Sequence, residues 1–286
     1  MRKYYTRPCN FYYGNYSKNL IKLKKALPLA GNYNISFDQI EFFERKKNGT
    51  IRSTTFNISE IKNLNINIKS EINADLKKIT SKRKDICRIK FNKPKIMGVL
   101  NVTPDSFSDG GLFFQHSKAL NQVDLMIKSG ASIIDIGGES TRPGSKTVKD
   151  KKEWERIKNI LSEVKNKFPK IILSIDTRKS YVMKKSIENG ANIINDVSGL
   201  NYDKKSFRII KSKNIPFILN HTQGTPNTMQ NNPKYDDVLL DIYDFFEKKI
   251  NVFLKKKIEK KFIIVDPGIG FGKNLNHNLR IMSKIS

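Results

Sequence analysis

Four polar side chains stand where apolar segments of this sequence end: Asn101, Asp176, Asn195 and Asp266. An apolar strand has little structural reason to end in a carboxylate or an amide, because a buried polar group without a partner is costly. A flat ligand with adjacent N–H donors, such as the guanidine-like edge of a heterocycle, would satisfy these groups with paired hydrogen bonds. The four residues therefore indicate a binding site for a polar heterocycle.

The neighbouring loops have the opposite chemical character. Ser140-Thr141-Arg142 supplies two hydroxyls and a guanidinium, which suit a phosphate group. The segment Gly268–Lys273 is glycine-rich and ends in a lysine, although it lacks the spacing of a P-loop. A metal ion that bridges the phosphates to Asn101 would fit this arrangement. The sequence shows neither a Ser-His-Asp set nor a nucleophilic cysteine, so we do not expect a covalent intermediate.

Short apolar runs and helical patterns alternate six times after residue 95. Each apolar run ends in an amide, a carboxylate or an imidazole. We expect strands at 96–102, 133–136, 171–175, 193–194, 216–219 and 262–265, and helices at about 117–129, 153–167, 180–188, 204–212, 235–257 and from about 276. The first strand is expected to be buried on both faces. This alternation is typical of a parallel sheet with right-handed crossovers.

Two architectures fit such a pattern: a (β/α)8 barrel and an open doubly wound sheet. An open sheet concentrates its polar loops at one switch point, whereas all six strand tips are polar here, which favours the barrel. A barrel typically needs roughly 250 residues, and 193 residues follow position 93. We therefore expect an α/β protein with a (β/α)8 TIM barrel over residues 94–286 that lacks its last two strand–helix units.

For other polar residues near the strand ends, a structural role is a simple alternative to a role in ligand binding. Asp135 lies within a strand, where contacts with neighbouring side chains would be enough to explain it. Glu139 and Asp196 can serve as structural caps. His221 can anchor a loop or contact a ligand.

Residues 1–93 are expected to form a small α+β region. Residues 39–45 and 50–56 flank an Asn-Gly pair, which is a strong hairpin signal. Helical patterns occur near 20–27 and 72–84, and apolar and polar residues alternate over 58–68. Because no residues here converge on a chemical task, we interpret the region as an accessory element of unknown role.

The chain is strongly basic, with a net charge of +27. Residues 1–93 carry 21 basic and 7 acidic residues, and the other 193 residues carry 33 and 20. Because the charge is spread evenly and no nucleic-acid-reading motif is present, we expect solvated faces and no nucleic-acid partner. Phosphate-bearing substrates would still be attracted by such a field.

Several other classes of protein are not indicated. No secretory signal or long apolar run is present, so we expect a cytoplasmic protein with no membrane partner. Cys9 and Cys87 lie far apart, and three scattered histidines make no zinc motif.

The segments that carry these residues resemble the dihydropteroate synthase family of pterin-binding barrels. The resemblance covers about residues 94–286. It rests on five motifs in order, with the first two the most specific, and on a supporting sixth: I-M-G-V-L-N-V-T-P-D-S-F-S-D-G-G (96–111), G-A-S-I-I-D-I-G-G-E-S-T-R-P-G (130–144), S-I-D-T-R-K (174–179), A-N-I-I-N-D-V-S-G (191–199), D-P-G-I-G-F-G-K-N (266–274) and H-T-Q-G-T-P-N-T-M-Q (221–230).

The resemblance implies a transferase of folate biosynthesis. In that reaction para-aminobenzoate displaces pyrophosphate from 6-hydroxymethyl-7,8-dihydropterin diphosphate, with Mg²⁺ on the diphosphate. Carried over by position, Asp176, Asn195 and Asp266 would hold the pterin, and Asn101 would contact the metal and the diphosphate. Asp176, Asp266 and Asn101 are thus the expected catalytic residues.

The resemblance assigns further residues to mobile loops. Phe107 would close over the para-aminobenzoate, and Thr141, Arg142 and Pro143 would help shape that pocket. Lys273 would support substrate binding from the glycine-rich motif.

Full-length family members commonly form homodimers, so a homodimer is the expected assembly.

The family also uses a lysine on strand seven and an arginine and a histidine on strand eight, which lie outside this sequence. Inactivity of the chain as given therefore stays open. Two alternatives also stay open: a methyltetrahydrofolate-type pterin methyltransferase, against which the loops at 103–111 and 139–144 argue, and a non-catalytic pterin-binding fragment.

Overall fold

The computed structural model describes residues 3–103, 112–140, 147–224 and 228–284, with only the backbone described for 112–116. The chain divides into two compact units, Met1–Lys84 with Lys284–Ser286, and Asp85–Ser283. The segment 85–93 thus groups with the second unit, although the sequence suggested a boundary after residue 93.

The first unit is an antiparallel sheet with helices. Its strands are β1 (Lys3–Tyr13), β2 (Leu27–Leu29), β3 (Asn32–Arg45) and β4 (Ile51–Asn57), and β3 pairs with each of the others. The expected hairpin is confirmed, because Arg45 pairs with Ile51 across the Asn-Gly turn. Phe37, Ile40 and Ile72 are fully buried in its core.

The helices of the first unit differ from the sequence expectation. The helix α1 covers Gly14–Lys22, so the pattern near 20–27 places it several residues too late, and Leu27 begins β2 instead. Within the alternating segment 58–68, residues Ile58–Asn63 form a 3-10 helix, which begins with a capping box made by Asn57 and Glu60. Asn65 then caps α2 (Ile66–Thr80).

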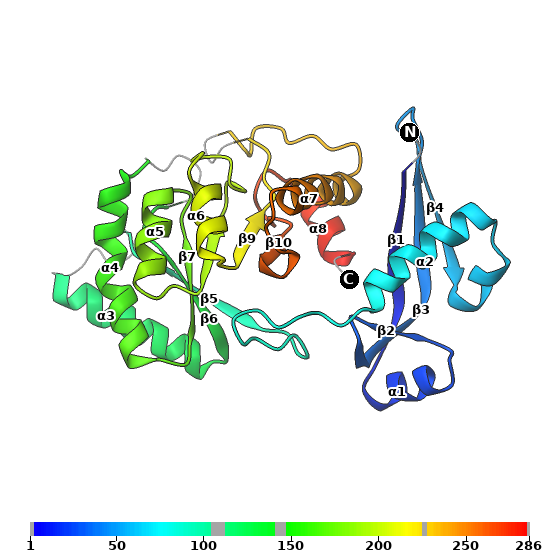
Figure 1. Ribbon diagram of the computed structural model, residues 1–286, viewed down its shortest axis with the longest axis horizontal. Coiled ribbons are helices and arrows are strands. Elements are labelled where there is room, and N and C mark those ends of the chain that lie inside the picture. Colours follow the sequence, from blue (N-terminus) through cyan, green and yellow to red (C-terminus); the bar gives the residue numbers. More distant parts are fainter. Residues whose placement is uncertain (1–2, 104–111, 141–146, 225–227, 285–286) are drawn as a thin grey trace. The chain divides into compact units, whose positions relative to one another are not determined.

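The second unit contains a six-stranded parallel sheet with the order β10-β9-β8-β7-β6-β5 (Figure 1). The strands and helices alternate along the chain as expected. They are β5 (Ile96–Asn101), α3 (Leu112–Lys128), β6 (Ala131–Gly137), α4 (Asp150–Lys167), β7 (Ile172–Asp176), α5 (Ser180–Glu188), β8 (Ile193–Asp196), α6 (Ser206–Lys213), β9 (Phe217–Asn220), α7 (Val238–Lys255), a 3-10 turn (Lys260–Phe262), β10 (Ile263–Asp266) and α8 (Leu275–Ser283).

The strand order follows the chain order without a reversal. A doubly wound sheet would reverse at a switch point, so this α/β sheet does not have the strand order of a doubly wound sheet. The helices α3, α4, α5 and α6 pack against one another in the same order.

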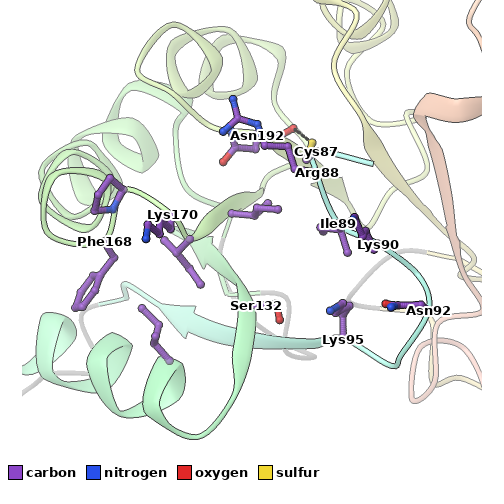
Figure 2. A pocket seen from close by; sticks show the side chains of 14 residues that line it. Cys87, Arg88, Ile89, Lys90, Asn92, Lys95, Ser132, Phe168, Lys170 and Asn192 are labelled. Atoms are coloured by element: carbon purple, nitrogen blue, oxygen red, sulfur yellow. Dashed lines mark hydrogen bonds between the residues drawn. The ribbon is translucent and has the colours of Figure 1, made fainter. Parts of the chain in front are cut away.

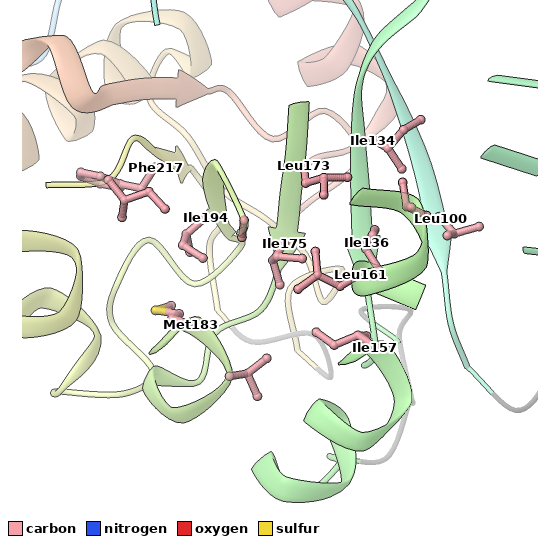
Figure 3. Packing of buried hydrophobic residues seen from close by; sticks show 14 of the residues in the cluster. Leu100, Ile134, Ile136, Ile157, Leu161, Leu173, Ile175, Met183, Ile194 and Phe217 are labelled. Atoms are coloured by element: carbon pink, nitrogen blue, oxygen red, sulfur yellow. The ribbon is translucent and has the colours of Figure 1, made fainter. Parts of the chain in front are cut away.

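Side chains alternate along each strand of this sheet, so successive residues lie on opposite faces. Figure 3 shows the apolar layer between strands and helices, where side chains from β6 and β7 meet Ile157 and Leu161 of α4. The residues between them on the same strands, Asp135, Ser174 and Asp176, therefore point to the other face.

The first strand is less buried than expected. Ile96 and Val99 of β5 are 57% and 54% exposed, and only Leu100 is buried. The reason is its position at the end of the described sheet, where it pairs with β6 alone. The prediction that this strand is buried on both faces was wrong.

Replacing Leu161 by Ala should lower the free energy of unfolding by about 2–5 kcal/mol, because Leu161 is fully buried against the sheet. Chemical denaturation of both proteins measures the change. Leu279→Ala is the matched control, since Leu279 is 55% exposed, and it should stay within about 0.5 kcal/mol of the original. Equal losses in the two variants would contradict the described core.

Candidate active site

The ends of four neighbouring strands, β5 to β8, place three of the expected site residues in one row. Asn101 pairs with Gly137, Gly137 with Asp176, and Asp176 with Asn195, from β5 to β8. Because the strands are parallel, all four residues lie at the carboxyl end of the sheet. Gly137 is the position without a side chain in this row: a Cβ atom there would lie 3.5 Å from both Asn101 Oδ1 and Asp176 Oδ2. The row therefore brings amide and carboxylate groups close together around a glycine.

A second polar layer lies directly below this row. Asn195 donates from Nδ2 to Oδ2 of the buried Asp135 at 2.9 Å, which fixes the orientation of the Asn195 amide. Its Oδ1 atom is buried and has no hydrogen-bond partner among the described residues. A buried acceptor without a partner indicates a place where a ligand can donate. Asp135 therefore has a role beyond contacts within its strand, because it orients the side chain of Asn195.

Burial is the main cause that raises the pKa of Asp176 well above its ordinary range, followed by the charges of Asp135, Glu153, Asp196 and Glu139. Burial likewise raises the pKa of Asp135. A charged carboxylate in this position needs N–H donors nearby, and a ligand with several N–H groups would supply them.

The tips of β9 and β10 form the next part of the site. Asp266 accepts from Asn220 Nδ2 at 3.0 Å and from the Gly268 backbone at 2.8 Å, so its carboxylate is held in one orientation. Gly268 has φ +67°, and a Cβ atom on it would lie 2.1 Å from the carbonyl oxygen of His221. Only glycine allows this close approach of two backbones.

Lys273 and His221 join the loops that follow these two strands. The buried Lys273 Nζ lies 3.2 Å from His221 Nδ1 and donates to the carbonyl oxygens of His221 at 3.2 Å and Phe271 at 2.8 Å. Burial lowers the pKa of Lys273 to about 8. Burial and the charge of Lys273 lower the pKa of His221 to about 4. His221 is thus a loop anchor in this structure, one of its two expected roles.

Glu139 and Asp196 have the structural contacts that the sequence allowed. Glu139 binds Arg178 and Lys179, both at 2.8 Å, and accepts from the Val148 backbone. Asp196 accepts from the backbone of Ser198 and Leu200, inside its own loop, and burial raises its pKa to about 6.

Other expected site residues lie outside the described residues. These are Phe107, Thr141, Arg142 and Pro143. The Asn101 side chain is described and exposed at the tip of β5.

Some residues close to the site had no signal in the sequence. Glu153 lies in the first turn of α4 and is fully buried. It contacts Thr177 and Lys179, which are 24 and 26 positions away, and no periodicity or motif links such positions. Asn220 had a signal, because it ends an apolar strand as Asn101 does.

A cavity of about 1070 Å³ lies at the opposite end of the sheet, near the starts of β6 and β7 (Figure 2). It is lined in part by Arg88, Lys90, Lys95 and Lys170, and by no carboxylate. In its lining, Cys87 Sγ donates to the carbonyl oxygen of Asn192 at 3.3 Å. This cavity is therefore separate from the polar strand tips.

No helix in the described ranges is long and apolar enough to cross a membrane. The same residues contain no cluster of three or more His, Cys, Asp or Glu side chains that could hold a metal ion.

Acid should destabilise the protein through His221. Its pKa is about 4 in the folded protein against 6.5 ordinarily, so the unfolded chain binds the extra proton first as the pH falls. The stability contribution is complete above pH 6.5 and is lost toward pH 4, by about 3 kcal/mol. Urea unfolding from pH 7 to 4 measures it.

His221→Gln is the control for this acid effect. Buried acids such as Asp196 titrate over the same pH range, so only the difference between the two proteins isolates the histidine. Identical pH dependence of the original protein and the variant would contradict the assignment.

The comparisons with known proteins agree with this geometry. A family model described as pterin binding enzyme matches residues 97–286. The dihydropteroate synthase of Haemophilus influenzae is 42% identical over 193 residues, which are 68% of this chain and 70% of that protein. The Escherichia coli enzyme is 40% identical over 196 residues, or 68% and 69%.

Solved structures are similar as well. The crystal structure of Yersinia pestis dihydropteroate synthase in a sulfonamide drug complex has a TM-score of 0.64 and 40% identity, and covers 69% of this chain and 71% of its own. Xanthomonas albilineans dihydropteroate synthase with 4-aminobenzoic acid has a TM-score of 0.62 and 32% identity, over 69% of each chain. This chain belongs to the dihydropteroate synthase family of pterin-binding enzymes.

Proposed function

We propose that this chain is a dihydropteroate synthase, an enzyme of folate biosynthesis. It condenses para-aminobenzoate with 6-hydroxymethyl-7,8-dihydropterin diphosphate and releases pyrophosphate. The observation that carries the proposal is the row Asn101–Gly137–Asp176–Asn195, in which amide and carboxylate groups gather around a glycine at the carboxyl end of the sheet.

The pterin ring would bind through its N–H edge. The Asp176 carboxylate accepts from ring N–H groups, and the unpartnered Asn195 Oδ1 accepts a further one. Asp266, held by Asn220 and Gly268, faces the ring from the tip of β10. These acceptors also stabilise the transition state, because positive charge develops on the pterin as the diphosphate departs.

In the reaction the bond between the pterin methylene carbon and the diphosphate oxygen breaks, and the pyrophosphate takes the bonding electrons. The amine nitrogen of para-aminobenzoate then forms a bond to the same carbon and loses a proton. The residues need only position the two substrates and stabilise charge, which agrees with the lack of a nucleophile in the sequence.

The donor set fits a magnesium ion at the tip of β5. The described residues include no cluster of metal-ligating side chains, and Mg²⁺ commonly uses one or two protein oxygens with substrate phosphates. The side-chain amide of the exposed Asn101 can supply such an oxygen, Oδ1. When bound, the ion would neutralise the diphosphate and make it a better leaving group.

The remaining assignments follow from the family resemblance. Thr141, Arg142 and Pro143, together with Phe107, would shape the pocket for para-aminobenzoate. Lys273 would act indirectly, because its Nζ is already bonded to two carbonyl oxygens. The six-stranded sheet would be part of the wall of a (β/α)8 barrel. The homodimer and the cytoplasmic location stay predictions.

Replacing Asp176 by Asn should lower kcat/KM for the pterin diphosphate roughly a hundredfold or more, because a charged acceptor opposite the pterin is lost. Pyrophosphate release in the presence of para-aminobenzoate measures it. The control is Glu155→Gln, since the exposed Glu155 pairs with Lys158 of the same helix. If the original chain binds pterin but releases no pyrophosphate, it is a non-catalytic pterin-binding protein.

Removing divalent metal should separate binding from turnover. A chelator should abolish pyrophosphate release, while 6-hydroxymethylpterin, which lacks the diphosphate, should bind with unchanged affinity, because Asp176 and Asn195 need no metal. Calorimetry with and without chelator measures the binding, and added Mg²⁺ should restore turnover. Loss of pterin binding on chelation would contradict the proposed placement of the ion.

A further inference from the structure

Three buried polar residues lie directly behind Asp176 and have no role in the function proposed above. Glu153 comes from the first turn of α4, and Thr177 and Lys179 come from the segment between β7 and α5. Their exposed fractions are 0%, 3% and 5%. Burying a carboxylate and an ammonium group is costly even when they are paired, so this cluster needs an explanation.

The contacts within the cluster fix the backbone that follows Asp176. Thr177 Oγ1 donates to Glu153 Oε1, and Lys179 Nζ donates to Glu153 Oε2. Lys179 Nζ also lies 2.8 Å from Glu139 Oε1. Both oxygens of Glu153 are therefore used, and both hold side chains that come within three residues of Asp176.

Thr177 also connects the two residues assigned to the pterin. Its backbone N–H donates to the carbonyl oxygen of Asn195 at 3.0 Å, and its hydroxyl reaches Glu153. Thr177 is the residue next to Asp176 in the chain. One residue thus links Asp176, Asn195 and the buried carboxylate of α4, so a shift of Thr177 would move both pterin contacts.

A purely stabilising role does not account for this arrangement. Glu153 places a negative charge near Asp176, and this charge adds to the effects of burial and of Asp135 in raising the pKa of Asp176. A cluster that only stabilised the fold would gain as much from apolar side chains of the same size. What apolar side chains could not supply is the directed hydrogen bond to Thr177.

We propose that Glu153, Thr177 and Lys179 are positioning residues that hold Asp176 and Asn195 at the spacing that the pterin edge requires. The inference rests on the proposed function, since it takes Asp176 and Asn195 as the pterin contacts. It adds a requirement on residues that do not touch the substrate. A misplacement of about 1 Å in such groups can cost on the order of a hundredfold in kcat/KM.

The sharpest test compares Thr177→Val with Thr177→Ser. Valine keeps the shape but leaves Glu153 Oε1 without its donor, whereas serine keeps the hydroxyl. Calorimetry with 6-hydroxymethylpterin should show affinity reduced about tenfold or more in Thr177→Val and nearly unchanged in Thr177→Ser. The KM for para-aminobenzoate should stay unchanged in both, because the proposed function assigns that substrate to residues other than Asp176 and Asn195.

A double-mutant cycle covers the case in which Thr177→Val does not fold. Glu153→Gln and Lys179→Gln each leave the other buried charge of this pair without its full partner, whereas the double variant removes both charges of the pair and leaves Arg178 as the partner of Glu139. Pterin affinity should therefore be lower in each single variant than in the double variant. Glu155→Gln, on the exposed face of the same helix, is the control and should match the original protein.

Two results would overturn the inference. Equal pterin affinity in Thr177→Val and Thr177→Ser would show that the hydroxyl does not position the site. Additive losses in the cycle would show that the pair acts only through separate contacts. The proposed function fails by a different result, namely Asp176→Asn binding 6-hydroxymethylpterin as tightly as the original protein.

Discussion

The site depends on one constraint, the alternation of side chains along parallel strands that share a common register. In β6 and β7 every second side chain packs into the apolar layer under the helices. The side chains that alternate with them lie on the other face of the sheet and include Asp135, Ser174 and Asp176. A slip of β7 by one residue would exchange Ile175 and Asp176 between the two faces. Packing of the apolar layer therefore also fixes the polar row.

Much of the second unit could be predicted from the sequence, because its strands are short apolar runs that end in polar residues. The helix expected at 180–188 has those limits in the structure, and each of the six strands lies within two residues of its expected position. The strand ends also gave the positions of Asn101, Asp176, Asn195 and Asp266. Periodicity and turn residues are local, so they report such features directly.

The sequence could not give features that depend on tertiary contacts. The exposure of β5 follows from its place at the end of the described sheet, which no local pattern encodes. Glu153 looks like an ordinary acidic residue in the first turn of a helix, yet it is fully buried against Thr177. Lys273 was expected to support substrate binding, and no sequence pattern indicated that its ammonium group donates to two backbone carbonyl oxygens.

Gly268, which follows β10, limits which substitutions this site can accept. At Gly268 the backbones of two loops meet with no room for a Cβ atom, and the same residue donates its N–H to Asp266. The closest contact at this point is between the backbones at Gly268 and His221. Because substitutions change side chains, a ligand group that contacts this backbone would be less affected by them than one that contacts the Asp266 side chain.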